Sequence, residues 1–166
     1  MLALVRPRPG MLAAVLAAFT LGAILPGALA KDGEPTAVRS ALARSSNVQG
    51  APERTMVLSR VVVEPGAKLA LHHHLGTQIS RIASGTLNYT VRRGSAAVWE
   101  GDAENEPQLV RKIAVGETDR VRPGQWLVEQ PSDIHEAANR GSTPVVIYLA
   151  TLLKSGSPPA SPVTLP

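Results

Sequence analysis

The sequence predicts an all-β protein, a sandwich or barrel of about eight to ten short strands. Two observations support this fold class. Short runs rich in valine, leucine and isoleucine recur across residues 55–153, and several alternate between apolar and polar residues, as strands with one buried face do. Turns rich in glycine and proline separate these runs, as at Pro65-Gly66 and Pro123-Gly124. The length of 166 residues allows one domain.

The first strand of the predicted barrel, residues 55–64, is rich in valine and other β-branched residues, which favour extended backbone. The later segments alternate or form short apolar runs between turns, so each is predicted to be a strand. These segments are residues 68–71, 78–83, 86–92, 96–99, 109–115, 117–121, 126–130 and 144–153, with a further strand that opens at His135. The stretch 101–108 is acidic and is predicted to be an exposed loop.

Two polar segments flank the predicted barrel of residues 55–153. Residues 31–54 are predicted to form an N-terminal arm, in which residues 36–43 form one short helix because three apolar residues lie near one helical face. Residues 154–166 form a tail rich in proline and serine, which cannot join the centre of a sheet because proline lacks a backbone donor. We expect the arm to cross to a neighbouring subunit and cover a sheet edge, which gives a homodimer.

Residues 1–30 have the features of a secretory signal peptide. Arg6 and Arg8 precede an apolar run, residues 11–25, and the small residues of Ala28-Leu29-Ala30 form the pattern that precedes cleavage. The run is short for a membrane span, which needs about 20 residues. We therefore expect a periplasmic or secreted protein that begins at Lys31 and has no stable membrane anchor after cleavage. An uncleaved N-terminal anchor is the alternative.

Composition excludes several classes of function. The chain has no cysteine, so disulfides, thiolate metal ligands and a cysteine nucleophile are excluded. Aromatic residues make up only 3%, which argues against a stacking platform for nucleic-acid bases. The formal charge is +4, and removal of Arg6 and Arg8 with the signal peptide leaves +2. This mild, scattered charge is interpreted as an aid to solubility, and no nucleic-acid partner is expected.

Three of the four histidines are consecutive, His72-His73-His74, at the end of a predicted strand. Because strand side chains alternate between faces, His72 and His74 point one way and His73 points the other way. A turn after His74 lets Gln78 fold back beside the two histidines. The fourth histidine, His135, lies far along the chain and would reach the site from another strand.

These residues predict a site for one divalent transition metal, Fe, Mn, Ni, Cu or Zn, because imidazole suits all of them. The predicted ligands are His72, His74, Gln78 and His135. Three histidines leave coordination positions open for water or a small-molecule substrate. The alternative interpretation is a solvated polar cluster without a ligand.

The same residues resemble the first motif of the cupin superfamily. Gly66, His72-x-His74, position 78 and Gly85 stand at the offsets of that motif, with Gln78 where the family usually has glutamate.

A second cupin motif is recognisable as Gly124, Pro131, His135 and Asn139, although two of its spacings differ by one residue from the usual pattern. The resemblance covers roughly residues 55–153 and implies a double-stranded β-helix, the small jelly-roll barrel. Ser80 shares the face of Gln78 and is expected to orient its amide, and Asn139 is expected to brace the strand after His135.

The resemblance leaves two functions open. The first is a metal-dependent oxygenase that acts on a small enolisable or phenolic compound, because open positions on a redox metal suit substrate and O₂ together. The second is a non-catalytic cupin that binds a small ligand or metal in the periplasm. Gln78 favours the second, since a neutral amide cannot act as the base that the usual glutamate provides. A neutral ligand also leaves the metal more positive, which favours anionic ligands such as enolates or carboxylates.

Overall fold

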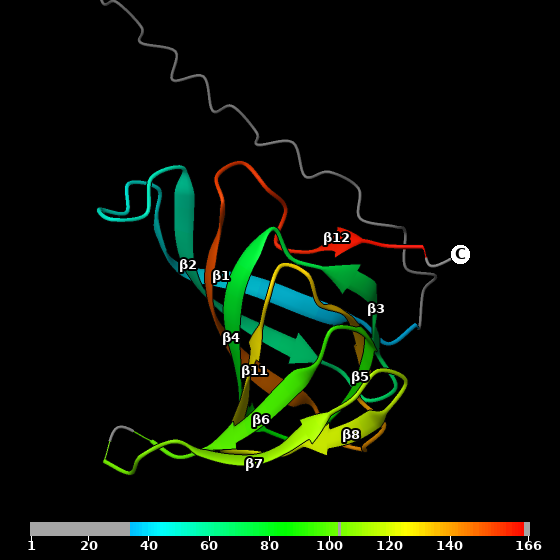
Figure 1. The fold of residues 1–166 in the computed structure, drawn as a ribbon. Coiled ribbons are helices and arrows are strands. Elements are labelled where there is room, and N and C mark those ends of the chain that lie inside the picture. Colours follow the sequence, from blue (N-terminus) through cyan, green and yellow to red (C-terminus); the bar gives the residue numbers. More distant parts are fainter. Residues whose placement is uncertain (1–33, 103, 165–166) are drawn as a thin grey trace, which may run out of the picture.

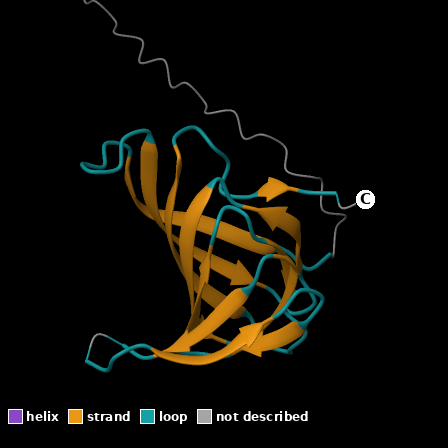
Figure 2. Ribbon diagram, in the orientation of Figure 1, coloured by secondary structure: helices purple, strands orange, loops and turns teal. Residues whose placement is uncertain are grey.

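The computed structural model describes residues 34–102 and 104–164, and this part of the chain contains twelve strands and no helix (Figure 2). The strands form two antiparallel sheets that face each other around one core (Figure 1). The all-β prediction is therefore confirmed. The predicted signal peptide lies outside the described residues.

The larger sheet has seven strands. They are β1 (Ala37–Ser45), β2 (Arg54–Val63), β4 (Gly76–Ser84), β6 (Ala96–Glu100), β7 (Gln108–Ile113), β9 (Gln125–Glu129) and β11 (Val145–Lys154). Their order across the sheet is β1-β2-β11-β4-β9-β6-β7, so strands far apart in the sequence lie side by side. In particular, β9 pairs with β4, which places Glu129 directly opposite Gln78.

The smaller sheet has five strands. They are β3 (Lys68–His73), β5 (Leu87–Arg93), β8 (Thr118–Val121), β10 (Ile134–Ala138) and β12 (Ser161–Pro162). Their order is β12-β3-β10-β5-β8. The two-residue strand β12 belongs to the proline-rich tail and pairs with β3 at the edge of the sheet, where a missing backbone donor is tolerated.

The core forms between the sheets because alternate residues of each strand point inward. On β2 the inward residues include Val61 and Val63, on β9 Leu127, and on β11 Ile147 and Leu149, all of them buried. The same alternation determines which polar residues face the interior. A polar residue that lies two positions along the strand from a buried apolar residue points to the same face and is also buried.

The helix predicted within residues 36–43 is wrong, because this segment belongs to strand β1. β1 pairs antiparallel with β2, from Ala37 opposite Val63 to Ser45 opposite Met56, with a bulge between Ala41 and Ala43. Every residue of β1 is exposed, so an apolar helical face would have nothing to pack against. An isolated helix of this length is marginal in water, whereas the edge of β2 offers a full row of backbone hydrogen bonds.

Gly85 lies in the tight turn between β4 and β5 with a φ of 74°, a conformation that favours glycine. A Cβ at this position would lie 2.7 Å from the carbonyl oxygen of Pro144. Asn139 braces the end of β10 as expected, because its amide donates to the carbonyl oxygens of Val63 at 2.9 Å and Thr143 at 2.8 Å.

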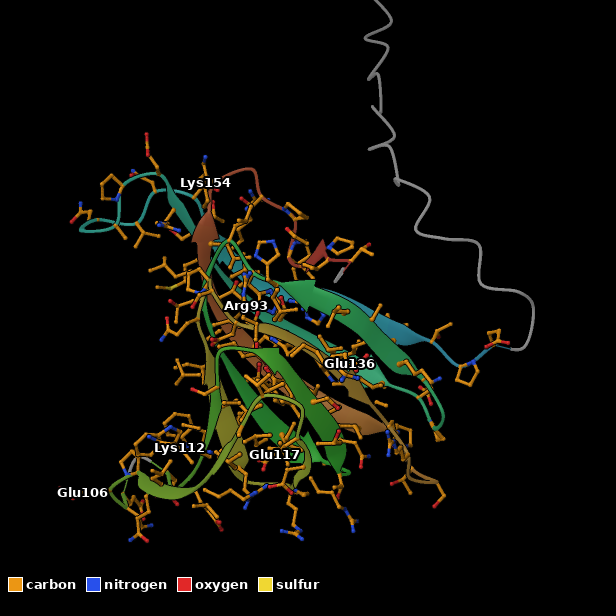
Figure 3. The ribbon with its side chains drawn as sticks, turned by 45° about the vertical axis from the view of Figure 1, so that its right-hand side comes forward. Arg93, Glu106, Lys112, Glu117, Glu136 and Lys154 are labelled. Atoms are coloured by element: carbon orange, nitrogen blue, oxygen red, sulfur yellow. The ribbon has the colours of Figure 1, made fainter. Side chains whose placement is uncertain are left out.

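The charged side chains labelled in Figure 3 lie on the outside of the two sheets. Lys112 and Glu106 stand near β7, and Lys154 stands at the far end of β11. Glu136 on β10 accepts a hydrogen bond of 2.8 Å from Arg92, outside the barrel. In the segments 34–102 and 104–164, no helix has the length and apolar character that a membrane crossing requires.

Candidate metal centre

Three histidines meet inside the barrel. Pairing of β10 with β3 sets His135 opposite His72, and His74 follows directly after β3. The ring centroids are 4.4 Å apart for His72 and His135, 4.9 Å for His72 and His74, and 5.2 Å for His74 and His135. One ring nitrogen from each lies within 4.8 Å of the other two, and His73 is not part of this group.

Backbone carbonyls orient two of the imidazoles. His72 Nδ1 donates to the carbonyl oxygen of Ala70 at 2.6 Å, and His74 Nδ1 donates to that of Pro159 at 2.7 Å. A histidine that donates from Nδ1 presents the lone pair of Nε2, which is the atom that then ligates a metal. The second bond comes from the tail, so the segment around β12 helps to build the site.

Glu129 lies among the histidines and was missed in the sequence analysis. Its Oε2 is 3.5 Å from His74 Nε2, and its Oε1 is 3.6 Å from His135 Nε2. The residue is buried on the inward face of β9, in step with Leu127. Its inward position on an alternating strand is a sequence signal of burial, but this signal does not show which residues the carboxylate meets. The usual cupin motif has a carboxylate at position 78, and here the neighbouring strand supplies one.

Gln78 and Ser80 hold this carboxylate. The amide nitrogen of Gln78 donates to Glu129 Oε2 and also lies 2.9 Å from His74 Nε2. Ser80 Oγ donates to the same Glu129 oxygen at 3.1 Å, so the expectation that Ser80 orients Gln78 is wrong. Among the residues that the structure describes, two buried side-chain atoms have no hydrogen-bond partner, Gln78 Oε1 and His135 Nδ1.

Burial sets the protonation of the site. It lowers the pKa of His74, and it lowers the pKa of His135 to about 4, with the carboxylate of Glu129 counteracting in both cases. Burial also acts to raise the pKa of Glu129, but the adjacent histidines and the bond from Gln78 outweigh it and leave that pKa below its usual value. At neutral pH the imidazoles of His74 and His135 are therefore neutral and the carboxylate of Glu129 is charged, which are the forms that bind a metal.

The residues fit a divalent transition metal. Glu129 is a buried anion, and no lysine or arginine of the described segments forms an ion pair with it. A buried charge without a counterion is costly. A cation held between three imidazole nitrogens and this carboxylate would balance the buried negative charge of Glu129. Imidazole and carboxylate donors suit Fe, Mn, Ni, Cu or Zn.

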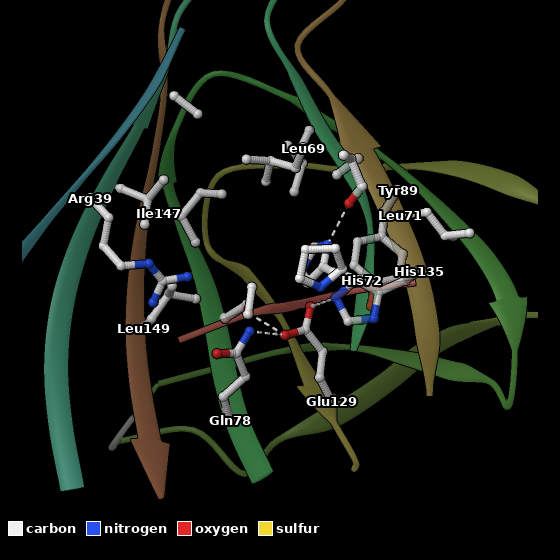
Figure 4. Close-up of a pocket in the computed structure, with 18 residues that line it drawn as sticks. Arg39, Leu69, Leu71, His72, Gln78, Tyr89, Glu129, His135, Ile147 and Leu149 are labelled. Carbon is white, nitrogen blue, oxygen red and sulfur yellow. Dashed lines mark hydrogen bonds and ion pairs between the residues drawn. The ribbon is translucent and has the colours of Figure 1, made fainter. Parts of the chain in front are cut away.

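His72 and His135 border a cavity of about 280 Å³ between the sheets (Figure 4). Leu69, Ile147 and Leu149 supply apolar walls, and Arg39 enters from β1. Tyr89 also lines the cavity and stacks on His135 with ring centroids 5.0 Å apart. The cavity can therefore hold a small, largely apolar compound beside the histidines.

Comparisons with known proteins bear on the fold. No protein-family model matches the sequence, and no curated protein matches it. A cupin 2 domain-containing protein from Halorhodospira halophila is similar in structure, with 15% identity, a TM-score of 0.51 and coverage of 77% of this chain and 70% of that one.

Two further solved structures have TM-scores below 0.5 and do not contribute to the assignment of the fold. A cupin-like protein from Thermotoga maritima has 17% identity, a TM-score of 0.49 and coverage of 76% of this chain and 75% of its own. KdgF from Halomonas sp. has 20% identity, a TM-score of 0.47 and coverage of 73% and 84%. At such identities the likeness shows the fold alone. Together with the strand order, the Halorhodospira structure shows that this chain has the double-stranded β-helix fold of the cupin superfamily.

Proposed function

We propose that the protein is an exported cupin that binds one divalent transition metal through His72, His74, His135 and Glu129. The buried carboxylate of Glu129, next to two histidines of the three-histidine cluster, is the observation that carries this proposal. In this donor set Gln78, which the sequence predicted as a ligand, instead holds the carboxylate in place.

The activity that this arrangement supports best is that of a metal-dependent oxygenase acting on a small enolisable or phenolic compound. An iron ion held by these four donors would keep open positions for the substrate, as non-haem iron sites do. The metal supplies Lewis acidity and, for Fe or Cu, redox chemistry. The chain contributes apolar walls, among them Leu69 and Ile147, which exclude water from the bound compound.

The alternative is a non-catalytic cupin that binds a small ligand or metal in the periplasm. Its support in the sequence was the replacement of the usual glutamate by Gln78. Glu129 supplies a carboxylate next to the same histidines, so this support is removed. Oxygen uptake by the Fe-loaded and Cu-loaded protein, measured across a panel of diketones and catechols, separates the two functions. Uptake with none of these compounds would favour the alternative.

The metal site is tested by elemental analysis of the purified protein and its variants. We expect about one transition metal per chain in the wild type and a loss of most of it in Glu129→Gln, because the variant removes the only anionic donor. Glu136→Gln is the matched control, since Glu136 lies next to His135 but pairs with Arg92 outside the barrel. Equal metal content in Glu129→Gln and the wild type would show that Glu129 is not a ligand.

Export is a separate part of the proposal and is based on residues 1–30 of the sequence. N-terminal sequencing of the exported protein checks it, and we expect a chain that begins at Lys31. An intact Met1 would favour the uncleaved anchor.

A further inference from the structure

Arg39 is a cation inside an otherwise apolar part of the cavity. It lies opposite the core residue Val61 in the pairing of β1 with β2, so its side chain points inward. As a residue of an edge strand Arg39 is exposed, but its guanidinium reaches into the cavity (Figure 4). Burial there lowers the pKa of Arg39, although an arginine stays charged at neutral pH.

No hydrogen bond or ion pair joins the guanidinium to another residue in the described part of the chain, and its five N–H donors face the cavity or solvent. The nearby acidic residue is Glu129, whose field acts on Arg39 without direct contact. Once the carboxylate of Glu129 is engaged with a metal, as proposed above, its charge no longer balances that of Arg39. The cavity then has a net positive charge that only an incoming anion can neutralise.

The geometry gives the position of that anion. Arg39 lies on one side of the cavity, and His72 and His135 lie on the other (Figure 4). The space between is bordered by apolar side chains such as Leu149 and Ile147. A ligand that satisfies both sides has an anionic group at one end, a short apolar body, and an oxygen-bearing group at the other end.

We infer that the cavity takes a small carboxylic acid and that Arg39 selects it by binding the carboxylate, so that a hydroxyl or carbonyl group at the opposite end faces the histidines. A guanidinium binds a carboxylate through two parallel N–H···O bonds, which are among the strongest hydrogen bonds in proteins. This inference rests on the proposed metal site and adds the class of substrate to it.

The test compares two compounds of the same shape, 4-hydroxybenzoate and its uncharged analogue 4-hydroxybenzamide, by calorimetric titration of the zinc-loaded protein. We expect the wild type to prefer the acid by at least about tenfold, which corresponds to about 1.4 kcal/mol. Arg39→Gln is expected to reduce the preference to about twofold or less. Arg39→Lys is expected to keep an intermediate preference. The lysine ammonium retains the positive charge but cannot form the two parallel N–H···O bonds of a guanidinium.

Arg44→Gln is the matched control, since Arg44 is on the same strand but does not line the cavity. It is expected to keep the preference of the wild type. A wild type that binds both compounds equally, or an Arg39→Gln variant that keeps the full preference, overturns the inference. The second result would mean that the metal alone binds the carboxylate.

Elemental analysis of the same samples separates this inference from the proposed function. A wild type without metal after incubation with zinc refutes the metal site. The titrations are then repeated on the metal-free protein, where the acid must still be preferred and Arg39→Gln must still abolish the preference. If the metal-free protein shows no preference for the acid that depends on Arg39, both the inference and the metal site are wrong.

Discussion

At the residue scale, the site is unusual because its carboxylate stands on a different strand from the carboxylate of the usual cupin motif. Gln78 stands on β4 where a glutamate is expected, and Glu129 stands directly opposite it on β9. Because the two residues are cross-strand neighbours, the carboxylate still reaches His74 and His135. A carboxylate thus lies beside the histidines although position 78 is a glutamine.

Acid is expected to destabilise the metal-free protein. Between pH 6.5 and about 4, His135 is protonated in the unfolded chain but remains neutral in the folded one. The unfolded state then binds more protons, so the contribution of His135 to the free energy of unfolding decreases as the pH falls through this window and levels off below it. The shift of the pKa corresponds to about 3 kcal/mol. Urea unfolding of chelator-treated protein at a series of pH values measures the effect.

His135→Gln is expected to flatten this pH dependence, whereas His73→Gln, which lies outside the cluster, is expected to leave most of it. If His135→Gln shows the same slope as the wild type, another group is responsible for it.

At the element scale, the tail helps to build the candidate metal site. Strand β12 pairs with β3 beside His72 and His73, and the carbonyl of Pro159 just before it orients His74. A chain that ends at Ser157 is expected to bind metal about 10-fold to 100-fold more weakly, the usual effect of losing a hydrogen bond to a ligand histidine. Chelator competition measures the affinity.

The control for this truncation is a chain that ends at Thr164, which retains both Pro159 and β12 and is expected to bind like the full chain. Circular dichroism checks that the barrel strands, which end at Lys154, still form in the shorter chain. Equal affinity of the two truncated chains would mean that the tail only covers the surface.

The elements also show what the sequence could predict. Alternation and turn residues were enough for the strands from β2 to β11, because each reflects a local pattern. The histidines could be identified because the motif has a fixed spacing on one strand and its neighbour. Glu129 and Arg39 could not be assigned in this way. Their places depend on which strands pair, and Glu129 meets a glutamine 51 residues away only after β4 and β9 have paired.

At the scale of the whole molecule, the outer face of the larger sheet predicts a dimer. Exposed apolar side chains cluster on the outer face of neighbouring strands, where Leu58 lies opposite Ala150 and Ala150 opposite Ile79. Val38 on the edge strand β1 and Tyr148 on β11 are also exposed. Such a contiguous apolar face is typical of an interface, and an edge strand can pair with its copy across a two-fold axis.

We expect light scattering to show a homodimer at micromolar concentration. Leu58→Lys combined with Val38→Lys is expected to shift the protein to a monomer, because each charge would be buried in the interface. Val115→Lys is the control, since Val115 is exposed at the opposite end of the larger sheet, after β7. A wild-type monomer under these conditions would contradict the prediction.

The bond between His74 and Pro159 also has a consequence for the order of folding. The two residues are 85 positions apart, and all the strands from β4 to β11 lie between them. Contacts between distant residues form late, because the intervening chain must first be ordered. Capture of the metal is therefore expected to be one of the last events of folding. In a refolding experiment, zinc uptake reported by a dye should lag behind strand formation followed by circular dichroism, so that a bound ion marks a chain whose barrel is already complete.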